Sequence, residues 1–195
     1  YMLMCKGEMS AAFKLANQAK STLKRMNHQF FESYANLLII LCDRYLGRGV
    51  EAIQLMNEVF TPIKHSKKTP LWVNLACGMM VVEYEQNRLE ESYQLGEQLI
   101  PLVSQSCVTE VVASVYLYQS RILHIEGKHS KAGRLLEQVE RILSLGDYDR
   151  FNSLVIHEKM RQALSINCAS SCELIYEKYA LDEYAQKGAW HLSSY

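Results

Sequence analysis

The sequence repeats with a period of 40 residues. Glycine or asparagine recurs at this interval through the whole chain of 195 residues, at Gly7, Gly47, Asn87, Gly127 and Asn167. These two residue types make up only 17 of the 195 residues, so five of them on one spacing are hard to assign to chance. Self-similarity at a period of about 20–50 residues is the signature of repeat architectures. We therefore expect the chain to fold as an array of similar units.

Two further columns of the repeat indicate how each unit folds. Five positions after the turn residue comes a small residue: Ala12, Ala52, Ser92, Ala132 and Cys172. Eight positions after it comes an aliphatic residue: Leu15, Leu55, Leu95, Leu135 and Ile175. Glycine and asparagine accept positive φ and close a helix, so that the chain reverses at once. The small residue lets the second helix approach the first closely, and the aliphatic residue enters the core. Each unit is predicted to be a helix A, a tight turn and a helix B.

The positions of the turns predict the helices. Helix A is expected at 29–46, 71–86, 108–126 and 149–166, with only its end in the first unit, and 188–195 is expected to begin a sixth. Helix B is expected at 8–25, 48–60, 88–103, 128–144 and 169–187. Two-helix units cannot bury their apolar faces alone, so neighbours stack over a continuous core. The prediction is an all-α fold, an α-solenoid of stacked helical hairpins in a right-handed superhelix, forming a single domain over 1–195.

Charge and hydropathy exclude several classes of protein. The 21 basic residues balance 21 acidic ones, whereas a nucleic-acid-binding surface needs an excess of Lys and Arg. The longest apolar run, 35–42, is far shorter than the roughly 20 residues that span a bilayer. Six cysteines lie mostly within apolar helical patterns, which suits free thiols in a reducing cytosol. We expect a cytoplasmic chain without nucleic-acid or membrane contact. Because a helical pattern already runs at Tyr1, we also expect a fragment of a longer protein.

No catalytic or metal-binding pattern is complete. His157 and Glu158 lack a second histidine four positions on, so the zinc motif H-E-x-x-H is not present. Carboxylate pairs such as Glu90 and Glu91 open a predicted helix B, where negative charge favours the helix dipole. The sequence has neither a phosphate-binding loop nor a nucleophile elbow. We expect no enzyme, and no cofactor or metal in these residues.

The turns resemble those of tetratricopeptide repeats. A short glycine or asparagine turn followed by a small residue occurs in "LGRGVEAIQL", "QNRLEESYQL" and "EGKHSKAGRLL". Helix A lacks the inner glycine of that motif, and the closing proline is mostly absent, which indicates a longer variant. This variant resembles the sensor region of the large bacterial LuxR-type activators related to the maltose regulator MalT. The phrases that carry this resemblance are "SRILHIEGKHSKAGRLLEQVERIL" and "HEKMRQALSINCASSCELIYEKY", in which an arginine precedes the turn residue by six positions.

The resemblance implies a function. In that family the helical-repeat sensor lies between an ATP-binding switch module and a C-terminal helix-turn-helix, and it receives an inducer or a regulatory protein. It implies that this chain binds a small-molecule effector or a regulatory protein or peptide for transcription regulation, and that it can self-associate. One alternative is a scaffold for protein–protein interaction with no switching role. An enzyme is a more distant alternative.

The concave face of the array is the candidate binding surface. In tetratricopeptide-like geometry one stripe of each helix A forms it, thirteen, ten, six and three positions before the turn residue. Its polar, aromatic and cationic members are Tyr34, Arg44, Asn74, Tyr84, Ser114, Arg121, His124, His157 and Arg161. Arg121 and Arg161 share a column in adjacent repeats, so stacking would form a fork suited to a carboxylate, a phosphate or an acidic peptide. The alternative is that these arginines bridge to glutamates on neighbouring helices and hold the repeats together.

Overall fold

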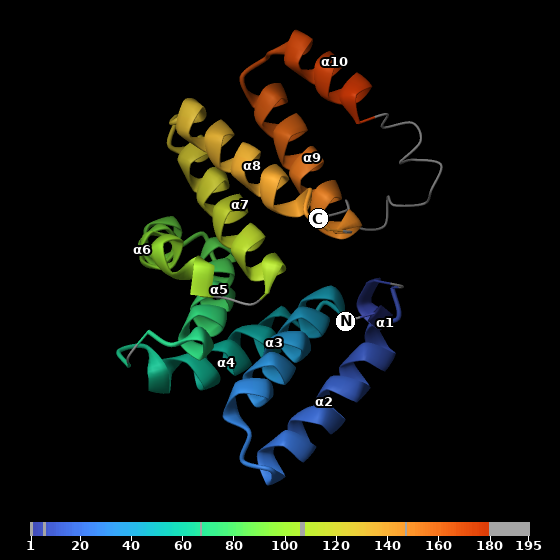
Figure 1. Cartoon of the computed structure of the whole chain (residues 1–195), viewed down its shortest axis with the longest axis vertical. Coiled ribbons are helices and arrows are strands. Elements are labelled where there is room, and N and C mark those ends of the chain that lie inside the picture. Colours follow the sequence, from blue (N-terminus) through green and yellow to red (C-terminus); the bar gives the residue numbers. More distant parts are fainter. Residues whose placement is uncertain (1, 6, 67, 106–107, 147, 180–195) are drawn as a thin grey trace. The chain divides into compact units, whose positions relative to one another are not determined.

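The structure is a computed structural model that describes residues 2–5, 7–66, 68–105, 108–146 and 148–179. Within these ranges every regular element is a helix, as predicted (Figure 1). The α-helices and the two short 3-10 helices, η1 and η2, are α1 (Met2–Cys5), α2 (Met9–Arg25), α3 (Gln29–Tyr45), α4 (Gly49–Phe60), η1 (Thr61–Ile63), α5 (Pro70–Glu85), α6 (Leu89–Leu99), η2 (Ile100–Gln105), α7 (Thr109–Ile125), α8 (His129–Leu143), α9 (Asp149–Ser165) and α10 (Ala169–Lys178).

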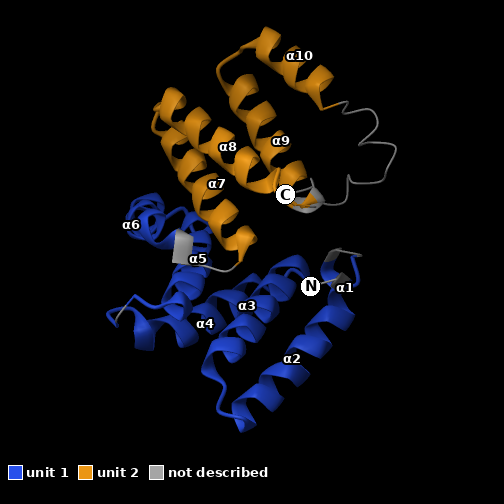
Figure 2. Ribbon diagram, viewed as in Figure 1, with its two compact units in different colours: residues 1–107 blue, residues 108–195 orange. Residues whose placement is uncertain are grey.

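The chain divides into two compact units (Figure 2). Unit 1 comprises residues 1–107 and holds α1 to η2, whereas unit 2 comprises residues 108–195 and holds α7 to α10. In unit 1, α2 packs on α3, α3 on α4 and α5 on α6; in unit 2, α7 packs on α8, α8 on α9 and α9 on α10. The A helices of neighbouring repeats also contact each other, α3 with α5 and α7 with α9. Each unit is therefore a stack of helical hairpins. The single continuous domain over 1–195 stays a prediction.

All five predicted turn residues have left-handed backbone conformations. Their φ angles are +78° at Gly7, +75° at Gly47, +59° at Asn87, +75° at Gly127 and +54° at Asn167. At the end of α3, the Gly47 N–H donates to the carbonyl of Arg44 (3.1 Å) and the Arg48 N–H to that of Asp43 (2.8 Å). This pair of bonds is the Schellman motif, and the same pair closes the other four A helices. The predicted reversals are confirmed.

A sixth left-handed turn lies outside the repeat period. Asn27, with φ +54°, ends α2 and connects helix B of one repeat to helix A of the next. Its N–H donates to the carbonyl of Lys24 (3.1 Å), and the His28 N–H donates to that of Leu23 (3.0 Å). The sequence signal was an asparagine two positions after a basic pair, Lys24-Arg25, which is typical of a helix C-terminus.

The structure corrects one predicted helix and limits another. The prediction of a helix over 88–103 is wrong in its last part, because α6 ends at Leu99 and the chain continues as η2. Pro101 has no N–H to donate, and its ring clashes with the carbonyl four residues earlier, so an α-helix cannot continue through it. The helix predicted over 169–187 is described as far as Lys178. The sixth helix A predicted at 188–195 lies outside the described residues.

The small-residue column marks where the two helices of a hairpin approach most closely. Ala12, Ala52, Ser92 and Ala132 are all buried. The Ser92 hydroxyl donates to the carbonyl of Met80 (2.8 Å), and in the next repeat the Ser120 hydroxyl donates to the carbonyl of Ala132 (2.9 Å). Each of these bonds joins helix A to helix B across a hairpin.

The aliphatic column is less uniform than predicted. Leu55, Leu95 and Leu135 are half-buried, but Leu15 is 55% exposed.

Candidate functional site

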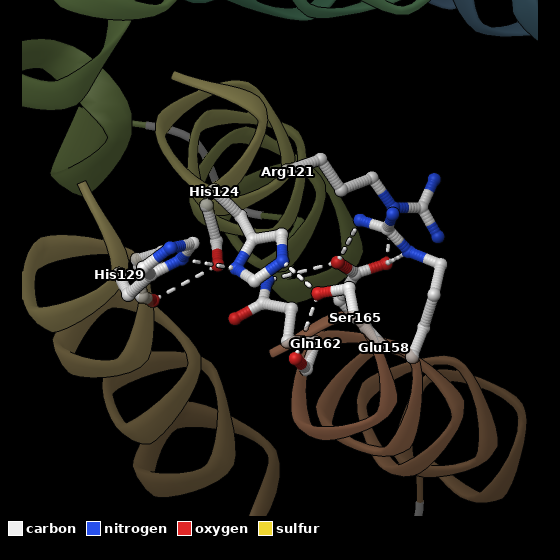
Figure 3. A network of polar contacts seen from close by, with 9 residues as sticks. Arg121, His124, His129, Glu158, Gln162 and Ser165 are labelled. Carbon is white, nitrogen blue, oxygen red and sulfur yellow. Dashed lines mark hydrogen bonds and ion pairs between the residues drawn. The ribbon is translucent and has the colours of Figure 1, made fainter. Parts of the chain in front are cut away.

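Polar side chains of α7 and α9 converge on one buried carboxylate in unit 2 (Figure 3). Glu158 of α9 is 1% exposed. Its Oε2 accepts hydrogen bonds from Nε of Arg121 (3.0 Å) and Nε of Arg161 (3.1 Å). Its Oε1 accepts from Nη2 of Arg161 (2.5 Å) and Nε2 of Gln162 (2.8 Å). The fork predicted from the two arginines is therefore formed, and Glu158 lies within it.

Helix spacing explains how these groups meet. Glu158, Arg161 and Gln162 are three and four positions apart on α9, so they share one face of the helix. That face lies against α7, which supplies Arg121. Gln162 also donates to the Ser120 hydroxyl (3.1 Å), which itself donates to a backbone carbonyl of α8. The network thus links all three helices of the repeat junction.

The network joins two guanidinium groups to one carboxylate. Burial raises the pKa of Glu158, but the hydrogen bond from Arg161 and the charge of Arg121 outweigh burial and hold that pKa below its usual value. The carboxylate is therefore ionised at neutral pH, and two guanidinium groups surround one negative charge. The side chains of Arg121 and Arg161 are still 18% and 40% exposed. The arginines bridge to a glutamate, as the second interpretation of the sequence had it, and parts of both guanidinium side chains reach the surface.

A histidine pair adjoins the network. His124 is only 7% exposed, and its Nε2 lies 2.5 Å from the Ser165 hydroxyl oxygen. Because that hydroxyl donates to the carbonyl of Gln162 (2.8 Å), Nε2 of His124 must carry the proton. Its Nδ1 is then the acceptor for Nδ1 of His129, 3.0 Å away. Burial lowers the pKa of His124, and nearby His129 and Arg161 lower it further, which fits a neutral ring.

The predicted site residues of unit 1 form separate contacts. The Asn74 amide donates to the Tyr34 hydroxyl (3.2 Å), and Asn74 is 1% exposed. Arg44 is bound to Glu85. Tyr84 is half-buried on α5. Buried Asn74 is thus unavailable to a partner. Within unit 1, Arg44 bonds to Glu85 and not to the Asn74–Tyr34 pair.

Unit 2 has one accessible stripe in the predicted columns. His157, Arg161 and Leu164 follow each other on α9 at spacings of four and three, which places them on one helix face. His157 is exposed, and Leu164 is 60% exposed. Ser114 is half-buried on α7. We call His157, Arg161 and Leu164, together with Arg121, the A-helix stripe of unit 2.

Sequence reasoning missed the other polar groups of this site, which are Glu158, Gln162 and Ser165. Glu158 was noted only as part of an incomplete zinc-binding motif. No sequence pattern pointed to Gln162 or Ser165 as site residues. His129 begins α8, is exposed and contacts His124. Within the described ranges, no group of three or more His, Cys, Asp or Glu side chains could hold a metal ion. No helix there is both long and apolar enough to cross a membrane.

Comparisons with known proteins support the fold. No family model and no curated protein matches this sequence. Two solved structures are similar, and both are of a Podospora anserina chain described as a kinesin light chain with nearly identical TPR-like repeats. Each match covers 95% of this chain and 92% of that chain at 15% identity, with TM-scores of 0.60 and 0.57. At this identity the likeness shows the fold alone. The chain therefore has a tetratricopeptide-like fold of stacked helical hairpins.

Proposed function

We propose that this chain is a protein-interaction module, and that the A-helix stripe of unit 2 binds an acidic segment of a partner protein. The observation that carries the proposal is the arginine pair. Arg121 and Arg161 come from adjacent repeats and are fixed by one buried carboxylate. Both side chains remain partly exposed, beside exposed His157 and Leu164.

The arginine pair is suited to carboxylate recognition. Guanidinium groups bind carboxylates in a planar, two-point geometry that an ammonium group cannot reproduce. Glu158 holds both side chains in place before a partner arrives, so less rotamer entropy is lost on binding. Leu164 adds an exposed apolar contact next to the charges. A segment with an acidic residue beside an apolar residue would complement this surface.

Peptide selection tests the proposal on the full chain. A random twelve-residue library is panned against the protein, and the dissociation constants of selected peptides are measured by fluorescence anisotropy. We expect acidic peptides that bind at least tenfold more weakly to Arg161→Gln. Glu158→Gln, which removes the internal negative charge but keeps a hydrogen-bond acceptor, is expected to bind them more tightly.

Arg25→Gln is the matched control. Arg25 is an exposed arginine of α2 in unit 1, and its substitution should leave the affinity unchanged. Selected peptides without acidic residues, or equal affinity for the parent and a folded Arg161→Gln, would contradict the proposal.

The regulatory role implied by the MalT-type resemblance stays a hypothesis. An effector-binding sensor and a plain scaffold would use the same stripe, but only a sensor would pass the binding event to other modules. An upstream phosphate-binding loop and a downstream helix-turn-helix in the full-length protein would support the sensor. Calorimetry against a panel of metabolites tests the small-molecule effector separately. The solved structures similar to this chain support the scaffold better, because they share its TPR-like repeats.

A further inference from the structure

One column of the repeat loses its side chain in unit 2. Six positions after the turn residue the chain carries Phe13, Ile53, Tyr93, Gly133 and Glu173. Phe13 packs on the core of unit 1, and its ring lies 4.2 Å from the guanidinium carbon of Arg48, directly before α4. A side chain in this column therefore fills the space between its own helix B and the start of the next one. Gly133 leaves that space empty in α8.

A pocket of about 230 Å³ opens at Gly133. A Cβ atom placed on Gly133 would meet no heavy atom within 4 Å. The apolar lining comes from three helices, with Leu136 on α8, Ile166 on α9 and Ile175 on α10. A glycine inside a helix lowers stability relative to alanine. At Gly133 the absence of a side chain also leaves open space beside α8. The pocket has room for the kind of side chain that the other repeats supply themselves.

The rim of the pocket is net positive. Glu137 lines the pocket, and Arg134 and Arg141 lie three positions before and four after it on the same face of α8. On the other side, Lys159 binds Glu140 (2.5 Å), which Lys178 of α10 also approaches (3.6 Å). Glu137 and Lys159 line the pocket itself, and together with the four groups that flank them they make four cations and two anions.

We infer that the Gly133 pocket binds one large apolar side chain, aromatic or branched aliphatic, from an acidic peptide segment. The inference deepens the proposed function, because it names the side chain by which the partner would be anchored. It rests on the proposed function in one respect, namely that the occupant of the pocket is a peptide. The pocket lies mainly on α8, α9 and α10, and His124 of α7 also lines it. It shares Gln162 with the Glu158 network, but none of its lining residues belongs to the A-helix stripe.

Three short peptides test the inference on the full chain. Acetyl-Glu-Phe-Glu-amide, acetyl-Glu-Ala-Glu-amide and acetyl-Lys-Phe-Lys-amide are titrated while the methyl NMR signals of Ile166 and Ile175 are followed. We expect the first peptide to shift both signals in a saturable manner, and the alanine peptide to bind at least tenfold more weakly. The lysine peptide should bind at least threefold more weakly than the first. Equal affinity of the alanine peptide would overturn the apolar anchor, and equal affinity of the lysine peptide would overturn the acidic partner.

A substitution that fills the pocket from within completes the test. Gly133→Ile introduces the residue that Ile53 supplies in the second repeat, and it should weaken the first peptide at least tenfold. Gly133→Ala, whose Cβ has free space, should fold and weaken binding severalfold even if the larger side chain disturbs the packing. Gly49→Ala, at another helical glycine with free space, is the control and should bind as the parent does.

Unchanged binding by both Gly133 variants would overturn the inference. The methyl signals of Ile166 and Ile175 report the Gly133 pocket, whereas Arg161→Gln reports the A-helix stripe. Failure of the A-helix stripe and failure of this pocket are therefore separate results.

Discussion

Replacing Glu158 with alanine removes the carboxylate that joins α7 to α9. Four hydrogen bonds from Arg121, Arg161 and Gln162 lose their acceptor. Removing one partner of a buried ion pair costs about 3–5 kcal/mol. The arginine side chains are 18% and 40% exposed and can be rehydrated, so we expect the lower end of that range, about 3 kcal/mol.

The expected change is large enough to measure by calorimetry. For a chain of this size, 1 kcal/mol of stability corresponds to about 2–4 °C in Tm, so the Tm should fall by about 6–12 °C at pH 7. Glu158→Gln keeps a hydrogen-bond acceptor, so we expect its Tm to fall by less than half as much as that of Glu158→Ala. Far-UV circular dichroism at 20 °C checks that both variants remain helical.

The pH dependence separates this network from general loss of packing. The pKa of Glu158 is lowered in the folded protein, so its stabilising contribution is complete above 4.5, the ordinary glutamate value. That contribution is lost as the pH falls through the lower pKa of the folded state. The difference in unfolding free energy between the parent and Glu158→Gln should therefore be constant at neutral pH and shrink below pH 4.5. A Tm of Glu158→Ala within 2 °C of the parent, or a difference that persists at pH 3, would refute this reasoning.

Three further outcomes are expected. Gly47→Ala forces a side chain into a φ of +75° and should lower the free energy of unfolding by about 1 kcal/mol in urea titrations; no change would mean that the turn relaxes. Ser120→Ala removes a buried hydroxyl that donates to α8, and a loss of about 1–3 kcal/mol is expected from the same titrations. Burial raises the pKa of Cys77 to about 12, whereas the hydrogen bond with the Ser171 hydroxyl lowers that of Cys168. Iodoacetamide at pH 8 should therefore label Cys168 much faster by mass spectrometry, and equal rates would show that α5 opens.

The backbone reversals were readable from sequence because they are local. A glycine or asparagine closes a helix through bonds to residues within one turn, so Gly47 and Asn87 can be assigned without knowing any distant contact. The same reasoning placed most helix ends within one or two residues. It ended one helix at 25 and began the next at 29, but it did not identify the left-handed conformation of Asn27, which lies off the 40-residue period. It also carried a helix past Pro101, a local signal that the repeat pattern overrode.

The site could be predicted only in part. Column spacing brought Arg121 and Arg161 together, because equivalent positions of stacked repeats lie side by side. The sequence could not show which group lies between them, since Glu158 is 37 positions from Arg121 and acquires its role only when α9 packs on α7. Asn74, expected on an open face, is buried.

The sequence by itself determined the hairpins, their period and the residues at which the chain turns, since these depend on backbone φ and on neighbours within a few positions. Only the tertiary structure decided which polar groups pair with one another and which remain exposed. It also decided that the position of Gly133, which has no side chain, borders a pocket. The physical reason is that burial and charge pairing depend on groups that packing brings together from distant parts of the chain.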